Sequence, residues 1–211
     1  MFNKPIFYGW WIAGIALAIN TLVSGPVYGG AGLWIDALEL DFGWSRTQLA
    51  IAFSLGQLEG SFASPIVGYL IDKFGGRKVI VIGAFFTAAG FFILSETRPV
   101  SADTTNWFDP IIFYFAYVIV MLGVSLGSWM PTNVVINSWF DRRRSLALSI
   151  GAVGFSLGTF AIVPILAHLI SPAVLGWKNT SLCLGVVFVL LSIPEYKFIK
   201  NNPEEIGEVP D

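Results

Sequence analysis

Long apolar stretches alternate with short polar connectors along the whole chain. Six stretches can be drawn, each close to the roughly 20 residues that an α-helix needs to cross the hydrocarbon of a bilayer. They cover about residues 6–32, 47–71, 79–94, 110–136, 146–170 and 180–198. Pro194 lies inside the last stretch, where a proline bends or ends a helix. The pattern predicts an all-α membrane protein with six transmembrane helices.

Composition indicates the same class. Of the 211 residues, 55% are hydrophobic and 12% are charged, whereas soluble domains carry about 25% charged residues. A soluble core of this length could not bury so much apolar surface, so we expect lipid to surround the chain. Lys4 before an apolar run resembles the start of a signal peptide, but no small-residue cleavage site follows. We therefore expect the first helix to be retained.

Single copies of two residue types narrow the chemistry. Cys183 is the one cysteine, which excludes an internal disulfide, and His168 is the one histidine, which excludes a metal site built from several histidines. We expect no metal, no cofactor and no nucleic acid. The expected partners are the lipid bilayer and a small-molecule substrate.

The connectors differ in charge between the two sides of the predicted membrane. With the N-terminus inside, nine of the twelve cations are cytoplasmic, at Lys4, Lys73, Arg77, Lys78, Arg142, Arg143, Arg144, Lys197 and Lys200. Acidic residues gather on the other side, at Asp36, Glu39, Asp41, Asp103 and Asp109. Positive charge favours the cytoplasmic side, so we predict both termini inside and a multi-pass protein of the plasma or inner membrane.

Tryptophans mark the ends of the predicted spans. They are Trp34, Trp44, Trp107, Trp139 and Trp177. Because tryptophan favours the headgroup level of a bilayer, we expect these rings to lie at the membrane surface.

Glycines recur at four-residue spacing, which places two small residues on one helix face and lets helices approach closely. The pairs are Gly25 and Gly29, Gly56 and Gly60, Gly123 and Gly127, and Gly154 and Gly158. They lie in the first, second, fourth and fifth stretches, and the third and sixth carry no such pair. The same four stretches contain prolines at which we expect kinks, Pro26, Pro65, Pro131 and Pro164.

The turn after the second stretch reads G-Y-L-I-D-K-F-G-G-R-K from Gly68 to Lys78. Three cations follow the apolar run, and two glycines let the chain reverse. The turn resembles the loop signature of the major facilitator superfamily, G-x-L-x-D-(R/K)-x-G-R-(R/K), with Gly76 where many members carry arginine. The residues that carry the likeness are Gly68, Leu70, Asp72, Lys73, Gly75, Arg77 and Lys78.

The resemblance implies the N-terminal six-helix half of a major facilitator transporter, with a three-plus-three inverted repeat. In that family the turn stabilises one conformation by contact with the other half. By resemblance we assign this latch role to Asp72, with Arg77 as its partner. The alternative is that the cations only fix the topology.

The turn after the fourth stretch contains W-F-D-R-R-R, with Arg142, Arg143 and Arg144 as a second basic cluster. It resembles the oxalate/formate antiporter-like and monocarboxylate-porter-like branch of the superfamily. Three more segments carry that likeness, F-Y-G-W-W at 7–11, L-x-x-x-F-G-W-S-R at 38–46 and P-E-E-x-G at 203–207. The branch implies a small organic anion, a mono- or dicarboxylate, as substrate.

Polar side chains within the spans are the candidates for a substrate or proton site. Glu59 is the clearest, because an ionisable group in a span is costly and usually marks a pathway or a pairing. It either faces a cavity, where it binds a proton or orients substrate, or makes a structural hydrogen bond to another helix. The other candidates are Asn20, Tyr28, Gln57, Trp129 and Asn133.

The leading functional hypothesis is a secondary transporter that works by alternating access. Residues 1–200 would form the six-helix domain, and residues 201–211 would begin the cytoplasmic central loop. A C-terminal six-helix half, absent from this chain, or a second copy would complete the cavity. No nucleophile-and-base pair or metal motif supports an enzyme. The alternative is a non-transporting receptor or scaffold on the same fold, and symport or antiport stays open.

Overall fold

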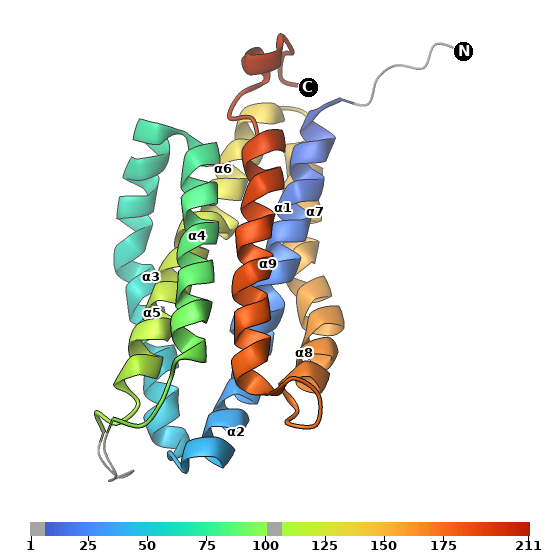
Figure 1. Cartoon of the computed structure of the whole chain (residues 1–211). Helices are drawn as coiled ribbons and strands as arrows, with labels where there is room; N and C mark the ends of the chain where they lie inside the picture. The colour runs from blue at the N-terminus through green and yellow to red at the C-terminus, as the bar shows by residue number, and fades with distance from the viewer. Residues whose placement is uncertain (1–6, 101–106) are drawn as a thin grey trace.

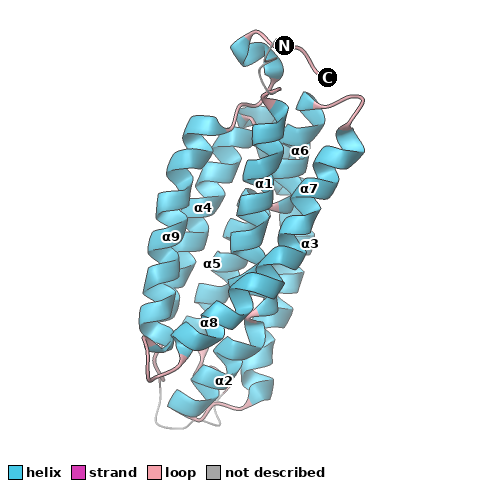
Figure 2. Cartoon of the chain, turned by 90° about the vertical axis from the view of Figure 1, so that its right-hand side faces the viewer, coloured by secondary structure: helices cyan, strands magenta, loops and turns pink. Residues whose placement is uncertain are grey.

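The computed structural model describes residues 7–100 and 107–211, and within them the chain is helical with no strand. Long helices run side by side along one bundle axis (Figures 1 and 2). The elements are α1 (Gly9–Val23), η1 (Ser24–Gly29), α2 (Ala31–Phe42), α3 (Arg46–Phe74), α4 (Gly76–Ser95), α5 (Ile111–Gly127), α6 (Trp129–Trp139), α7 (Arg144–Leu157), η2 (Gly158–Ile162), α8 (Val163–Ile170), α9 (Gly176–Phe198) and η3 (Pro203–Ile206). The prediction of an all-α protein is confirmed. Lys4, Ile6 and Asp103 lie outside the described residues.

Five helical segments in the described part are long and apolar enough to cross a membrane. They are Gly9–Gly29, Gly76–Ser95, Ile111–Trp139, Arg144–Ile170 and Gly176–Phe198. These segments correspond to the first, third, fourth, fifth and sixth predicted stretches. The predicted second stretch is α3, which has 29 residues but is not among the five. Its length suffices to span, and its polar side chains lower its hydropathy, so the count of six spans stays a prediction.

Three of the four predicted kinks coincide with breaks in the helices. Pro26 lies within the π-helical η1, and Pro164 follows the π-helical η2 by two residues. Pro131 lies in the first turn of α6, just after the chain breaks at Ser128. A proline lacks the amide hydrogen and clashes with the carbonyl four residues earlier, so the break falls on its N-terminal side. At Pro65, α3 continues without interruption.

Both basic turns lie at the same end of the bundle as the two ends of the described chain (Figure 1). The residues after α9, 199–211, are called the C-terminal tail below. The tail contacts both turns: Asn201 accepts a hydrogen bond from the Arg77 amide at 2.8 Å, and Ser138 donates one to the Asn201 carbonyl. The predicted clustering of cations at one end is therefore present, and the assignment of that end to the cytoplasm stays a prediction.

Four of the five tryptophans face the protein interior instead of lipid, and their level in the membrane stays a prediction. Trp34, Trp44, Trp139 and Trp177 are 7% exposed or less, and Trp107 alone is open at 55%. Each buried indole donates to an acceptor inside the protein, the acceptors being the Pro26 carbonyl, Asp109, the Lys200 carbonyl and Asp41. A buried indole N–H needs such a partner, and these rings join connectors to helix ends instead of anchoring them to lipid.

Close glycine contacts hold helices α4 and α5 together. A Cβ placed on Gly83 would lie 2.5 Å from the Gly127 Cα and 2.7 Å from the Gly123 carbonyl oxygen. Both glycines of the α5 pair therefore contact Gly83, a single glycine of α4 in the third stretch. Gly83 has no glycine four residues away, so the four-residue pattern did not identify it. Gly185 of α9 is also a close-contact position, because its Cβ would lie 2.5 Å from the Phe92 ring. The expectation that the third and sixth stretches lack such faces is wrong.

Candidate functional site

A cavity of about 180 Å³ lies among the helices at the level of Gly60, the middle residue of α3. Five elements contribute to its wall. The lining residues are Tyr28 from η1, Gly60, Ser64 and Val67 from α3, Val124 and Ser125 from α5, Ser128, Trp129 and Met130 at the start of α6, and Phe155 from α7. Neither α4 nor α9 contributes to this wall. The breaks at η1 and between α5 and α6 occur where these elements reach the cavity.

Aromatic rings form one side of this cavity. The rings of Trp129 and Phe155 meet edge to face at 5.5 Å, and Tyr28 lies 6.4 Å from Phe155. Tyr28 and Trp129 are both nearly half exposed, so their faces are available to a solute. The structure thus brings together the two aromatic residues that the sequence singled out. Phe155 belongs with them, but nothing in its apolar surroundings in the sequence distinguished it.

Glu59 adjoins the cavity through Ser125. The Ser125 hydroxyl donates to one carboxylate oxygen of Glu59 at 3.2 Å. The other oxygen, Oε1, is buried and has no hydrogen-bond partner. One half of the carboxylate therefore makes the helix-to-helix bond that the structural interpretation expects. The second oxygen, Oε1, is an unpaired acceptor, as the interpretation of Glu59 as a proton or substrate site requires.

Asn20 does not line the cavity but lies behind its wall residue Ser128, at a junction of three segments. It is fully buried, donates to the Gly151 carbonyl of α7 at 2.9 Å and accepts from the Ser128 hydroxyl at 2.9 Å. Its amide therefore satisfies groups at the place where α5 ends and α6 begins. Of the remaining candidates, Gln57 is exposed on α3, and Asn133 has a buried carbonyl oxygen with no partner. The structure places neither of these two on the cavity wall.

The basic turn between α3 and α4 consists of a single residue outside the helices, Gly75. Its φ of +83° belongs to the region that glycine adopts readily, as the predicted reversal requires. Asp72 is exposed, and within the described residues no ion pair joins it to Arg77. The Arg77 guanidinium instead lies over the Tyr196 ring, 4.2 Å from its centre. Lys73 lies against the rings next to it on α3, and Lys78 is exposed.

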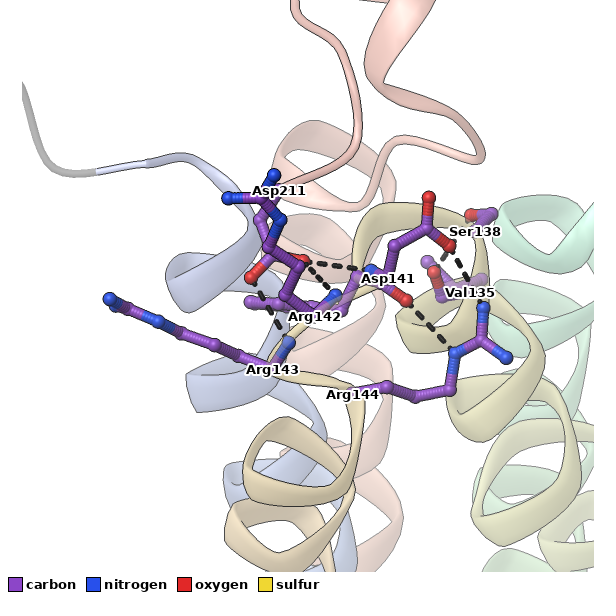
Figure 3. Close-up of polar contacts among 8 residues, drawn as sticks. Val135, Ser138, Asp141, Arg142, Arg143, Arg144 and Asp211 are labelled. Atoms are coloured by element: carbon purple, nitrogen blue, oxygen red, sulfur yellow. Dashed lines mark hydrogen bonds and ion pairs between the residues drawn. The ribbon is translucent and has the colours of Figure 1, made fainter.

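The second basic turn is closed by the end of the C-terminal tail (Figure 3). The Asp211 carboxylate accepts from three consecutive amides, those of Asp141 at 2.7 Å, Arg142 at 3.0 Å and Arg143 at 3.2 Å. Arg144 bridges to Asp141 at 3.1 Å. A carboxylate at the start of a helix satisfies free amides and complements the helix dipole. The Arg143 side chain extends away from these bonds (Figure 3).

One buried acidic residue was missed by the sequence analysis. Glu195 of α9 is 1% exposed, and its Oε2 has no hydrogen-bond partner. It lies beside a small gap shared with Thr87 and Gly123. In the sequence, Glu195 lies between Pro194 and Lys197 at the end of a predicted span, where a charged residue normally faces the surface.

The sequence matches a family model over residues 6–210, and the family is the Major Facilitator Superfamily. The chain belongs to the Major Facilitator Superfamily. Together with the long apolar helices, this membership makes it a multi-pass integral membrane protein. The suspected family is thereby confirmed.

Named relatives within the superfamily include carriers of carboxylates. The chain is 25% identical over 185 residues to an oxalate:formate antiporter of Oxalobacter formigenes, covering 87% of this chain and 41% of the relative. It is 25% identical over 191 residues to human monocarboxylate transporter 14, covering 88% and 34%. It is 26% identical over 185 residues to monocarboxylate transporter 3 of Gallus gallus, covering 86% and 32%. The chain thus spans less than half the length of these relatives, which lie in the branch that the motifs suggested.

Proposed function

We propose that this chain is one six-helix unit of a secondary transporter that moves small organic anions across the plasma membrane by alternating access. Membership of the superfamily and the names of the relatives support a carrier rather than an enzyme. The observation that carries the proposal is the cavity between α3, α5, α6 and α7, with aromatic rings on one side and the Glu59 carboxylate beside it. Transporters of this kind bind substrate between helices whose continuity is broken near the site.

The cavity is proposed to be half of the binding site. Its volume of about 180 Å³ is below the roughly 300–1,000 Å³ of ordinary small-molecule sites. None of its described lining residues is a cation, whereas a carboxylate substrate needs a charged partner in a low-dielectric site. A second unit, either a C-terminal six-helix half or a second copy of this chain, would supply the opposite wall and the cation. Residues 1–200 would then form the domain, and 201–211 the start of the connecting loop.

Glu59 is proposed to bind a proton or to orient the substrate. The hydrogen bond from Ser125 fixes one carboxylate oxygen, and Oε1 is the atom left to accept. A charge in this position is costly unless a proton or a partner neutralises it. Glu59→Gln keeps the shape and the bond to Ser125 but cannot cycle a proton.

The experiment is uptake of labelled oxalate, formate and lactate into proteoliposomes that hold the full-length protein containing this chain. We expect wild type and Glu96→Gln to transport, since Glu96 is exposed on the opposite side of the bundle from the basic turns. We expect Glu59→Gln to lose at least tenfold in rate at equal incorporation. Full activity of Glu59→Gln would refute the role of Glu59. Absence of transport of all three solutes by the wild type would refute the proposed substrate class.

The turn between α3 and α4 is proposed to be a conformational latch, formed by Gly68, Asp72, Lys73, Gly75, Arg77 and Lys78. Arg77 is held by Tyr196 and by the tail, so it stays with this unit. Asp72 is exposed and without an ion pair in the described residues, which leaves its carboxylate available to the second unit. The partner of Asp72 in the latch would therefore be a cation or helix N-terminus of that unit rather than Arg77.

A further inference from the structure

A second hollow lies on the outside of the bundle, between α4 and α9. It is a groove of about 700 Å³ near the end that carries the basic turns. Figure 1 shows α4 and α9 side by side, and the central cavity touches neither helix. The groove is therefore separate from the proposed substrate site.

The rim of this groove is basic. Arg77, Lys197 and Lys200 all line it. None of the three forms an ion pair within the described residues. Glu195 is next to this rim in sequence, but it is buried on the side of α9 that faces α4 and α5, where Thr87 lies. The rim therefore holds three positive charges, none of them in an ion pair in the described part of the chain; Glu205 of the tail, the carboxylate next to Lys200, accepts instead from the Asn201 amide.

Arg77 is the rim cation whose position is best defined. Its Nε is buried and has no hydrogen-bond partner, while its guanidinium is fixed over the Tyr196 ring. Buried donors are nearly always satisfied, and a guanidinium is shaped to bind phosphate or carboxylate oxygens. The Tyr196 ring thus holds the Arg77 guanidinium at the groove, and within the described residues no carboxylate pairs with it.

The floor of the groove is apolar and extends from this rim toward the interior of the membrane. Val81 and Phe85 follow Arg77 at one and two turns along α4, which gives a length of about 12 Å. Ile193 forms the facing wall on α9. Phe85 is 50% exposed and Ile193 is 61% exposed, so both face outward from the bundle. A soluble anion would leave this surface uncovered, whereas an acyl chain would cover it.

We propose that the α4–α9 groove binds one anionic phospholipid. The headgroup phosphate lies between Arg77, Lys197 and Lys200, and one acyl chain runs along Val81 and Phe85. Basic pockets between membrane helices on the cytoplasmic side recognise anionic headgroups in this way. The inference does not depend on the transport activity proposed above. Because Arg77 also belongs to the α3–α4 turn, the lipid would hold that turn against α9.

Native mass spectrometry of the purified full-length protein tests the site, with dioleoyl phosphatidylglycerol and dioleoyl phosphatidylcholine titrated separately. We expect tighter binding of phosphatidylglycerol by the wild type. The double variant Lys197→Gln/Lys200→Gln should weaken that binding about 25-fold, at about fivefold for each cation near the membrane surface. The control Arg142→Gln/Arg143→Gln removes two cations from the same end of the bundle outside the groove, and it should keep the wild-type affinity. An equal loss in both double variants, or no loss in the groove variant, would overturn the proposal.

Two further measurements test whether the ligand is a lipid, and they remain informative if the charge variant does not fold. Glycerol 1-phosphate carries the same phosphate without acyl chains, and it should not displace phosphatidylglycerol. Ile193→Trp fills the apolar wall without changing charge, and it should also weaken binding of phosphatidylglycerol. Displacement by glycerol 1-phosphate, or unchanged binding in Ile193→Trp, would show that the floor does not hold an acyl chain. Either result would overturn the proposal even if the charge variant did not fold.

Discussion

Replacing Gly83 by alanine tests whether direct backbone contact holds α4 to α5. The added Cβ would lie 2.5 Å from the Gly127 Cα and 2.7 Å from the Gly123 carbonyl oxygen. Carbon atoms in good contact are about 3.5–4.0 Å apart. The neighbouring atoms belong to a helix backbone and cannot rotate away as a side chain would. The two helices must therefore separate by about 1 Å at this point.

The magnitude follows from two opposing terms. A gap of about 1 Å forfeits up to about half of the dispersion energy along the contact, and overpacking of this kind costs about 1–3 kcal/mol. Alanine is better than glycine in a helix interior by about 1 kcal/mol. The net expectation for Gly83→Ala is a loss of up to about 2 kcal/mol, which lowers the midpoint of thermal unfolding by up to about 8 °C for a chain of this size.

Gly14→Ala is the matched control. Gly14 is an exposed position of α1, and a Cβ there would meet no atom within 4 Å. Only the propensity term acts, so this variant should be as stable as wild type or more stable by up to about 1 kcal/mol. Thermal unfolding of both variants in the same detergent, followed by the loss of the monodisperse peak, measures the difference. Equal or greater stability of Gly83→Ala relative to Gly14→Ala would refute direct backbone contact at this seam.

Two further predictions concern buried polar groups. Asn20→Ala leaves the Gly151 carbonyl without its donor and should lower the free energy of unfolding by about 1–3 kcal/mol, measured by the same unfolding experiment; wild-type stability would contradict the junction role of Asn20. Trp139→Phe keeps a buried ring but removes the hydrogen bond to the Lys200 carbonyl, so amide exchange in the C-terminal tail should be about fivefold faster. Trp177→Phe removes an equivalent indole bond at the other end of the bundle and should leave exchange in the tail unchanged.

The positions of the helices and of their breaks could be predicted from the sequence wherever a local feature determines them. Apolar runs of membrane length set the positions of the helices, and Gly75 set the reversal between α3 and α4. Pro26 and Pro164 marked the places where helical hydrogen bonding changes register. Tyr28 and Trp129 were among the candidates for a substrate site, and both line the cavity. In each case the cause lies within a few residues of the effect.

Hydrogen-bond partners far apart in the chain could not be deduced from local pattern. The buried indole of Trp44 bonds to Asp109, and that of Trp177 bonds to Asp41. A tryptophan at a span end has the same local sequence whether its ring lies in lipid or against another helix. Asn20 likewise has partners more than 100 residues away, at Ser128 and Gly151. The sequence alone predicted a polar residue in a span and could not choose between cavity and junction.

Three of the four segments that resemble the carboxylate-transporter branch lie at the end of the bundle that carries the basic turns, and the fourth, residues 38–46, joins α2 to α3 at the other end (Figure 1). Phe7 and Trp10 of the first segment pack edge to face on Phe140 of the second, with ring centres 5.4 and 4.9 Å apart. A Cβ at Gly9 would lie only 2.9 Å from the Phe140 ring, so the absence of a side chain at Gly9 lets α1 pack closely on Phe140. The Trp139 indole then bonds to the tail. The 7–11 segment, the α6–α7 turn and the tail therefore form one joint, and none of the residues in these contacts lines the cavity. Their similarity to the branch is therefore evidence about how this end of the bundle is held together, and the residues that carry it are not those that line the cavity.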